Sequence, residues 1–256
     1  MSHNITVEGG TSVRLPTAGK YCDRDIVVTA QGGTEDLDAV LTEQEALIVE
    51  LQDTLRGKAA GGGDPKALLD ASLNNTLTSI DSTVTSVIGH ACRGLTKLKT
   101  VNLPNATSIG TYAFYGCTAM ISFNAPKVTS LGTYSLYNCK MESVNFPLAT
   151  GITQNAFYNC LNLEKADFGV ASKINQAAFG YCESLVALIL RRTSSICTLS
   201  VATNAFSGTP IAEGTGYVYV PAALIETYKT ATNWTNYASQ FRAIEDYPEI
   251  CGEVVA

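Results

Sequence analysis

The stretch that decides the fold is residues 109–130, which read IGTYAFYGCTAMISFNAPKVTS. The same pattern follows three more times, as LGTYSLYNCKMESVNFPLATG (131–151), ITQNAFYNCLNLEKADFGVASK (152–173) and INQAAFGYCESLVALILRRTSS (174–195). It is preceded by IGHACRGLTKLKTVNLPNATS (88–108). A period of 21 or 22 residues predicts one small structural unit stacked many times. Such a stack shares a continuous core and encloses no deep pocket, so it favours binding over catalysis.

Each repeat predicts a short strand that alternates inward and outward side chains. In Thr100-Val101-Asn102-Leu103, Val101 and Leu103 are expected to point inward, while Thr100 and Asn102 point outward. An apolar residue follows each strand centre after eight positions and marks a corner of the coil. The pairs are Ile80/Ile88, Val101/Ile109, Phe123/Leu131, Val144/Ile152, Ala166/Ile174 and Leu188/Ile196. The constant offset indicates a fixed distance between strand and corner.

A second inward ladder is predicted on the opposite side of each coil. It consists of Ala113-Phe114, Ser135-Leu136, Ala156-Phe157, Ala178-Phe179 and Ala205-Phe206. The cysteines follow the same period at Cys117, Cys139, Cys160 and Cys182, which places one thiol in each coil and not several around a metal. Equivalent side chains point in parallel, so we expect free, buried thiols that pack as small apolar groups.

The chain divides into six predicted parts. We expect a small β attachment module at 1–33, a coiled-coil stalk at 34–57, a Gly-rich linker at 58–64, an N-terminal cap at 65–76, a repeat solenoid at 77–221 and a helical C-terminal cap and tail at 222–256. The strands of the first module are expected at Ile5–Val7 and Ile26–Thr29. The fold class is therefore an α/β solenoid of short repeats, in which Trp234 is expected in the core of the C-terminal cap.

The stalk prediction depends on apolar residues at alternating spacings of three and four. Leu37, Leu41, Ile48, Leu51 and Leu55 form this seam together with the polar Gln44. Heptad spacing favours self-association, with a homotrimer as the expected state. The alternative is an amphipathic helix that lies on its own domain, because Val40 and Leu47 widen the apolar stripe.

Composition excludes several functional classes. The chain has 256 residues and a net charge of −6, and seven acids without a base lie between Glu35 and Asp53. We expect no nucleic-acid partner, because the chain shows no basic patch of the kind that phosphate backbones require. No apolar run is long enough to insert in a membrane, and the N-terminus has no secretory signal, so we expect synthesis in a host cytoplasm and release by another route.

No catalytic centre, metal site or cofactor is predicted. The only histidines are His3 and His90, and neither has an evident partner for nucleophilic catalysis. Gly214-Thr215-Gly216 is expected to form a turn before a strand and not a phosphate-binding loop.

The repeat pattern, IG-x-x-AF-x-x-C-x-x-L-x-x-V-x-L-P, resembles the BspA-type leucine-rich repeats of bacterial surface adhesins and phage or prophage tail proteins. The resemblance covers residues 77–246 and includes the C-terminal segment YVPAALIETYKTATNWTNYASQFRAIED. Cys92 and Leu95 depart from the pattern, where Phe and Cys are expected. LPTAGKYCDRDIVVTA (15–30) is similar to a short module of tail-associated phage proteins. These resemblances imply a non-enzymatic tail fibre or receptor-binding protein of a virion or extracellular particle, attached through its N-terminus to other tail or particle proteins. A bacterial cell-surface adhesin and a purely structural particle protein are the alternatives.

The outward side chains of the strands are the candidate ligand-binding residues. We expect a cell-surface glycan or protein to bind Thr100, Asn102, Ser122, Asn124, Ser143, Asn145, Lys165, Asp167 and Tyr219. Alternatively, stacked asparagines form a ladder of hydrogen bonds that only stabilises the stack. A rival aromatic surface is formed by Tyr112, Tyr115, Tyr134, Tyr137 and Tyr158, because tyrosine is a frequent anchor at interfaces.

Overall fold

The computed structural model describes residues 4–6, 12–14, 76–200 and 204–252. The chain divides into two compact units, residues 1–46 and 47–256. In the first unit, β1 (Asn4–Thr6) pairs antiparallel with β2 (Ser12–Arg14). The first predicted strand, Ile5–Val7, overlaps β1. The predicted strand at 26–29, the stalk at 34–57, the linker and residues 65–75 of the N-terminal cap lie outside the described residues.

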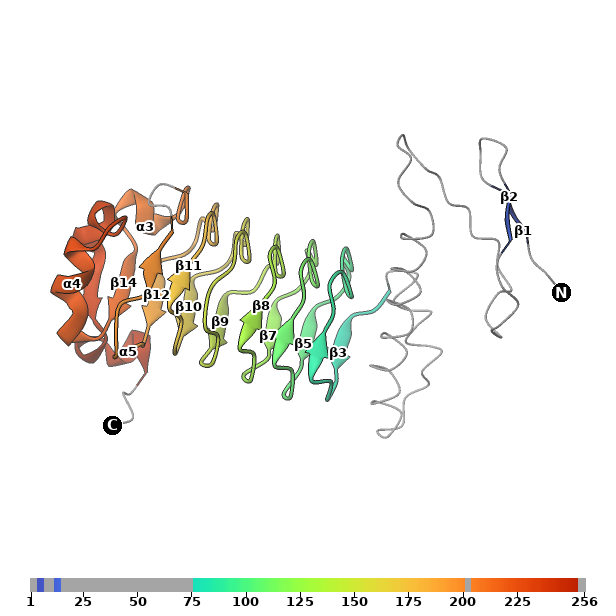
Figure 1. Ribbon diagram of the computed structural model, residues 1–256, viewed down its shortest axis with the longest axis horizontal. Helices are drawn as coiled ribbons and strands as arrows, with labels where there is room; N and C mark the ends of the chain where they lie inside the picture. The colour runs from blue at the N-terminus through green and yellow to red at the C-terminus, as the bar shows by residue number, and fades with distance from the viewer. Residues whose placement is uncertain (1–3, 7–11, 15–75, 201–203, 253–256) are drawn as a thin grey trace. The chain divides into compact units, whose positions relative to one another are not determined.

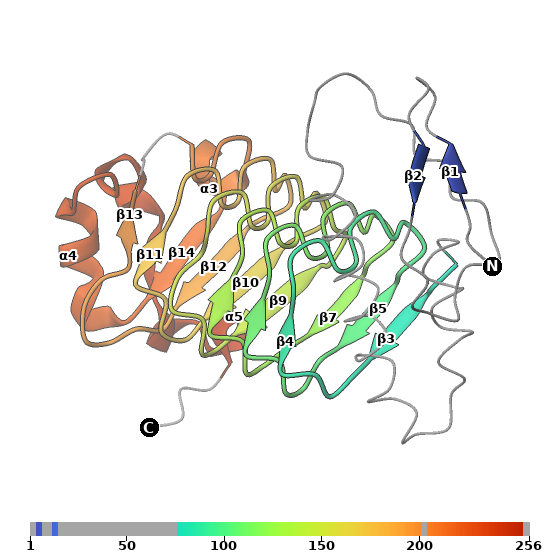
Figure 2. The same ribbon diagram turned by 45° about the vertical axis from the view of Figure 1, so that its right-hand side comes forward.

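In the second unit the repeats wind as successive coils, each contributing one strand to a long front face (Figures 1 and 2). We call these the front strands: β3 (Ser79–Asp81), β5 (Thr100–Asn102), β7 (Ser122–Asn124), β9 (Ser143–Phe146), β10 (Lys165–Phe168), β12 (Ala187–Leu190), β14 (Tyr217–Val220) and β15 (Phe241–Ala243). They pair in parallel as two sheets, ordered β3-β5-β7 and β9-β10-β12-β14-β15. The break between β7 and β9 falls where Cys139 and Met141 stand one residue closer than Cys117 and Met120.

Two-residue strands form a second, narrower row at the corner of the coils. They are β4 (Ser86–Val87), β6 (Ser108–Ile109), β8 (Ser130–Leu131), β11 (Lys173–Ile174) and β13 (Thr198–Leu199). The inward corner residues Ile109, Leu131, Ile152 and Ile174 are buried, as the eight-residue offset predicts. The offset is wrong at both ends of the array. Val87 and not Ile88 pairs with Ile109, and Leu199 and not Ile196 pairs with Ile174.

The core contains the predicted ladder of rings. Phe157, Phe179 and Phe206 are fully buried and stack in succession with centroid separations of 5.4 and 5.9 Å. A second ladder, from the front strands, holds Phe146 and Phe168 with centroids 5.8 Å apart. Rings from the two ladders meet edge to face, as Phe157 and Phe168 do at 6.1 Å. Each ring therefore packs against the coil before it and the coil after it.

The periodic cysteines Cys117, Cys139, Cys160 and Cys182, which we call the cysteine spine, are free and buried as predicted. Each sulfur also donates a hydrogen bond to a backbone carbonyl of the preceding coil. The Sγ–O distances are 3.1 Å from Cys117 to Cys92, 3.3 Å from Cys139 to Phe114, 3.1 Å from Cys160 to Leu136 and 3.0 Å from Cys182 to Phe157. Burial raises the pKa of Cys117 to about 12, so the thiol stays protonated and remains a donor.

The C-terminal residues close the array with short helices and the strands β14 and β15. The helices are α3 (Pro210–Glu213), η1 (Ala222–Leu224), α4 (Ile225–Thr230), η2 (Thr235–Gln240), η3 (Ile244–Asp246) and α5 (Pro248–Cys251). Trp234 is fully buried against Phe206, and its indole N–H donates to the carbonyl of Cys197 at 2.7 Å. The expected position of Trp234 in a core is therefore confirmed. Gly214 ends α3 ahead of β14, as the predicted turn requires.

Replacing Phe157 by Ala should lower the free energy of unfolding by about 3–5 kcal/mol, because the ring is fully buried between two neighbouring rings. Chemical denaturation monitored by circular dichroism measures this change. Tyr158→Ala is the matched control, since its ring is adjacent in sequence but only half-buried. Equal losses in the two variants would contradict a shared inner ladder.

The buried thiols predict a loss of stability in alkali. Burial raises the pKa of both Cys117 and Cys197 from 9.0 to about 12. Because the unfolded thiols ionise first, each contributes its full stability below pH 9.0 and loses it as the pH rises toward 12. The loss is about 1.4 kcal/mol per thiol for each pH unit in that window. The free energy of unfolding should fall between about pH 8 and about pH 10.5, and it should fall less in Cys117→Ala/Cys197→Ala than in the parent chain. Chemical denaturation at the two pH values measures both changes. An equal fall in the free energy of unfolding in the variant and in the parent chain would contradict the prediction.

Candidate functional site

The front face presents the predicted polar row in register across neighbouring strands. Asp81, Asn102 and Asn124 are aligned across the first sheet, and Asn145 and Asp167 are aligned across the second. Thr100, Ser122, Asn124, Ser143, Asn145 and Lys165 are exposed, while Asn102 and Asp167 are half-buried. The structure therefore brings these predicted residues onto one surface.

Part of this row forms the hydrogen-bonded ladder that the alternative interpretation predicts. The side-chain amide of Asn102 donates to Asp81 Oδ1 at 2.9 Å, and that of Asn124 donates to Asn102 Oδ1 at 2.7 Å. The bonds align the amides along the stack, so the ladder contributes to the packing of the coils. Exposed edges of the same groups still face solvent, so a structural and a binding role are compatible here.

The row does not extend to Tyr219, which is only 3% exposed. Ile244 and Cys251 cover Tyr219 together with its neighbour Ile189, and Tyr247 packs edge to face on Tyr219 with centroids 5.4 Å apart. Tyr219 lies on the outward face of the sheet as expected, but the expectation that it is exposed there to a ligand is wrong. Burial is the main cause that raises its pKa. The C-terminal residues fold back over this part of the sheet because β12 is apolar on both faces.

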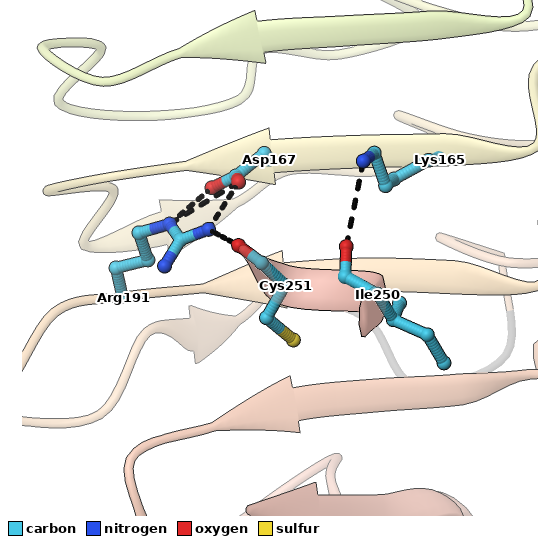
Figure 3. A network of polar contacts seen from close by, with 5 residues as sticks. All are labelled: Lys165, Asp167, Arg191, Ile250 and Cys251. Carbon is cyan, nitrogen blue, oxygen red and sulfur yellow. Dashed lines mark hydrogen bonds and ion pairs between the residues drawn. The ribbon is translucent and has the colours of Figure 1, made fainter. Parts of the chain in front are cut away.

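Polar contacts hold this C-terminal segment in place (Figure 3). The Arg191 guanidinium pairs with both carboxylate oxygens of Asp167, at 2.8 and 2.7 Å, and also donates to the carbonyl of Cys251. The hydrogen bond to Asp167 is the main cause that raises the pKa of Arg191. Lys165 Nζ donates to the carbonyl of Ile250 at 3.4 Å. Two predicted ligand-binding residues, Lys165 and Asp167, thus bind the chain itself.

The five tyrosines of the rival surface form a second candidate site, which we call the tyrosine ribbon (Tyr112, Tyr115, Tyr134, Tyr137 and Tyr158). All five are half-buried. His90, Tyr112 and Tyr134 stack in one column with centroid separations of 5.1 and 4.8 Å. Tyr115, Tyr137 and Tyr158 stack in a second column at 4.5 and 5.4 Å. Because ring faces contact ring faces within each column, the ribbon presents mainly ring edges and hydroxyls.

Arg93 lies against the first rings of the ribbon, and phenol groups of the ribbon are protonated. The Arg93 guanidinium lies 5.5 and 5.2 Å from the ring centroids of Tyr112 and Tyr115, within cation–π range. Partial burial and then the neighbouring phenols raise the pKa of Tyr137, and burial and then Tyr181 raise that of Tyr158. The hydroxyls of these two residues therefore remain protonated at neutral pH and able to donate hydrogen bonds.

Two of the ribbon tyrosines occupy a backbone conformation that disfavours their side chain. Tyr112 and Tyr134 have φ values of 56° and 57°, in the left-handed region. The equivalent residue one coil later is Asn155, at 54°. A bulky residue in this conformation costs about 1–2 kcal/mol relative to its ordinary backbone conformation. Stacking returns about 0.5–1.5 kcal/mol per ring pair, so it offsets much of this cost.

Sequence reasoning missed an uneven distribution of charge along the repeats that carry most of the ribbon. Residues 82–141 contain no Asp or Glu but carry Arg93, Lys97, Lys99, Lys127 and Lys140, in a chain whose net charge is −6. All five of these side chains are exposed. The whole-chain sum conceals this segment, whereas a count in windows of two or three repeats would have found it.

The described residues supply no catalytic or metal-binding arrangement. No group of three or more His, Cys, Asp or Glu within 76–200 and 204–252 is placed to hold a metal ion. His90, the one histidine in this part of the chain, stacks on Tyr112 and takes part in neither of the ion pairs there, which join Arg191 to Asp167 and Lys229 to Glu226. Within the same ranges, no helix has the length and apolar character that a membrane crossing needs.

Comparison with known proteins identifies the repeats. No curated protein matches the chain. A solved leucine-rich cell surface protein from Faecalibacterium prausnitzii A2-165 shares 14% identity over 73% of this chain and 72% of that one, at a TM-score of 0.39 that carries no structural argument. The family model described as the BspA type leucine-rich repeat region matches residues 85–212 in six copies, which is half of the chain. With its parallel strands in coil register, the chain belongs to the BspA-type leucine-rich repeat family.

Proposed function

We propose that this chain is a non-enzymatic recognition protein, a tail fibre or receptor-binding component of a phage or prophage-derived particle. Its ligand is a glycan or protein on a host-cell surface. The observation that carries the proposal is the exposed polar row on the front strands, from Thr100 to Asn145, which is held in register on stacked coils. A rigid lattice of hydroxyls and amides binds polar ligands with little loss of conformational entropy.

The tail location is supported by the resemblance of residues 15–30 to a module of tail-associated proteins, and attachment would occur through that end. Self-association of residues 34–57 as a trimer would present three arrays to one surface. Linked copies convert individually low affinities into high avidity. Membership of the repeat family fits a bacterial cell-surface adhesin equally well. The asparagine ladder favours a third role, as a purely structural particle protein.

Immunogold electron microscopy of producer cultures separates these locations. Antibodies against this chain should label tails of released particles and not the envelope of intact producer cells. Label on intact producer cells would instead support the adhesin, and label on neither would contradict both locations.

Binding of the fluorescently labelled chain to a panel of bacterial cells tests recognition by the front row. Asn124→Ala/Asn145→Ala should reduce the affinity for bound cells at least about tenfold, because two exposed amides are removed from the centre of the row. Ser86→Ala/Ser130→Ala is the matched control, with two exposed polar residues on the narrow row of strands. Equal affinity of the two variants would contradict a binding role for the front row.

A further inference from the structure

We infer that the tyrosine ribbon, with Arg93 against its rings and further exposed cations in the same repeats, forms a binding site for an anionic polysaccharide. This inference deepens the recognition role proposed above, but it concerns a different surface from the front row. It also holds whether a tail or a cell carries the chain. Three independent observations support it: the charge of the segment, the backbone conformation of its tyrosines and the parts of the rings that remain accessible.

The charge of the segment selects an anionic ligand. The five exposed cations of residues 82–141 face no acid from their own segment, which has none. Neither of the two ion pairs shown among the described residues involves them, since these pairs join Arg191 to Asp167 and Lys229 to Glu226. Two of the five contact the protein otherwise, Arg93 on the ribbon rings and Lys127 on Asn105. A local excess of positive charge attracts anions even on a protein of negative net charge.

The backbone conformation of the ribbon indicates that its tyrosine rings have a role other than forming the turn. Asn155 meets the same left-handed turn one coil later, and Gly116 and Asn138 occupy a second left-handed position in the ribbon coils. Ala177 holds the same turn in the coil that follows Asn155, so the turn itself requires no ring, and Gly or Asn is what the backbone prefers at such positions. Tyr112 and Tyr134 instead combine a disfavoured conformation with a half-exposed ring. Residues in disfavoured backbone conformations are found mainly at functional sites.

The accessible parts of the rings favour a sugar polymer over a nucleic acid. Single-stranded nucleic acids bind by stacking bases on open aromatic faces. In the ribbon the inner faces are occupied, since Tyr112 and Tyr134 stack at an interplanar angle of 5° and Tyr137 and Tyr158 at 3°. What remains are hydroxyl donors and electropositive ring edges, which suit carboxylate, sulfate or phosphate groups on a hydroxyl-rich chain.

The spacing of the ribbon favours a polymer over a single sugar. Equivalent rings recur at 4.8 Å in the first column and at 4.5 and 5.4 Å in the second. An extended polysaccharide with a charged group in each sugar unit can therefore contact a tyrosine hydroxyl in each successive coil. The binding free energies of these contacts add along the stack. Free monosaccharides that make the same contacts would bind more weakly, because each would lose its translational freedom separately.

The test measures binding of the full chain to four probes at an ionic strength of about 0.15 M. The probes are polygalacturonate, chondroitin sulfate, neutral dextran and single-stranded oligothymidylate. At least one of the two anionic polysaccharides should bind about tenfold or more tightly than dextran, with an affinity that falls as salt is added. No preference over dextran, or tighter binding of the oligothymidylate than of either polysaccharide, would overturn the inference.

Variants separate the ribbon from general electrostatics. Tyr112→Asn/Tyr134→Asn should keep the melting temperature, because Asn155 shows that Asn fits this turn, and should lower polysaccharide affinity about tenfold. Tyr217→Asn is the control, a half-buried tyrosine of β14 whose ring contacts Tyr219 and Arg242, and it should bind as the parent chain does. Should the double variant fail to fold, Arg93→Gln/Lys97→Gln/Lys140→Gln must show the same loss, since exposed charges do not support the core. Parental affinity in the folded double variant, or in this triple variant, overturns the site. Polysaccharide binding by a parent chain that binds no bacterial cells would instead contradict only the front-row proposal.

Discussion

The structure depends on the requirement that each inward side chain lies directly against its equivalent in the next coil. Rings stack on rings from Phe157 to Phe206, and each thiol of the spine donates to a carbonyl one coil back. The free energy of this packing is therefore shared between neighbouring coils and is available to no coil alone. Because the repeat length is fixed by this contact, the outward residues also recur in register, and both candidate binding surfaces follow from the inner packing.

The interior could be predicted from the sequence because its constraints are local and periodic. Phe157, Cys160 and Val144 recur at fixed offsets, and a side chain that recurs at the coil period must meet its equivalent. The corners at the ends of the array were less predictable. Val87 and Ile88 are both apolar and adjacent, so periodicity alone does not select the one that pairs with Ile109. Near Leu199 three additional residues lengthen the corner, which a constant offset does not accommodate.

The surface was harder to predict because its state depends on contacts between distant parts of the chain. Tyr219 alternates outward like the other row residues, and only the return of Ile244 and Cys251 across the sheet buries it. Asp167 likewise pairs with Arg191, and that cation in turn binds the backbone at Cys251 (Figure 3). The left-handed conformation of Tyr112 and Tyr134 could not be predicted either, since tyrosine normally argues against it.

The most direct test of coil-to-coil packing is the deletion of one complete coil, residues 143–164, which joins Glu142 to Lys165. If each coil contacts only its neighbours, the shortened chain should fold with a cooperative thermal transition. Small-angle X-ray scattering should then show the second unit shortened by about 5 Å, the spacing of adjacent strands. A chain that loses all cooperative structure on this deletion would contradict the stacked arrangement, because a core common to the whole domain would then hold the coils together.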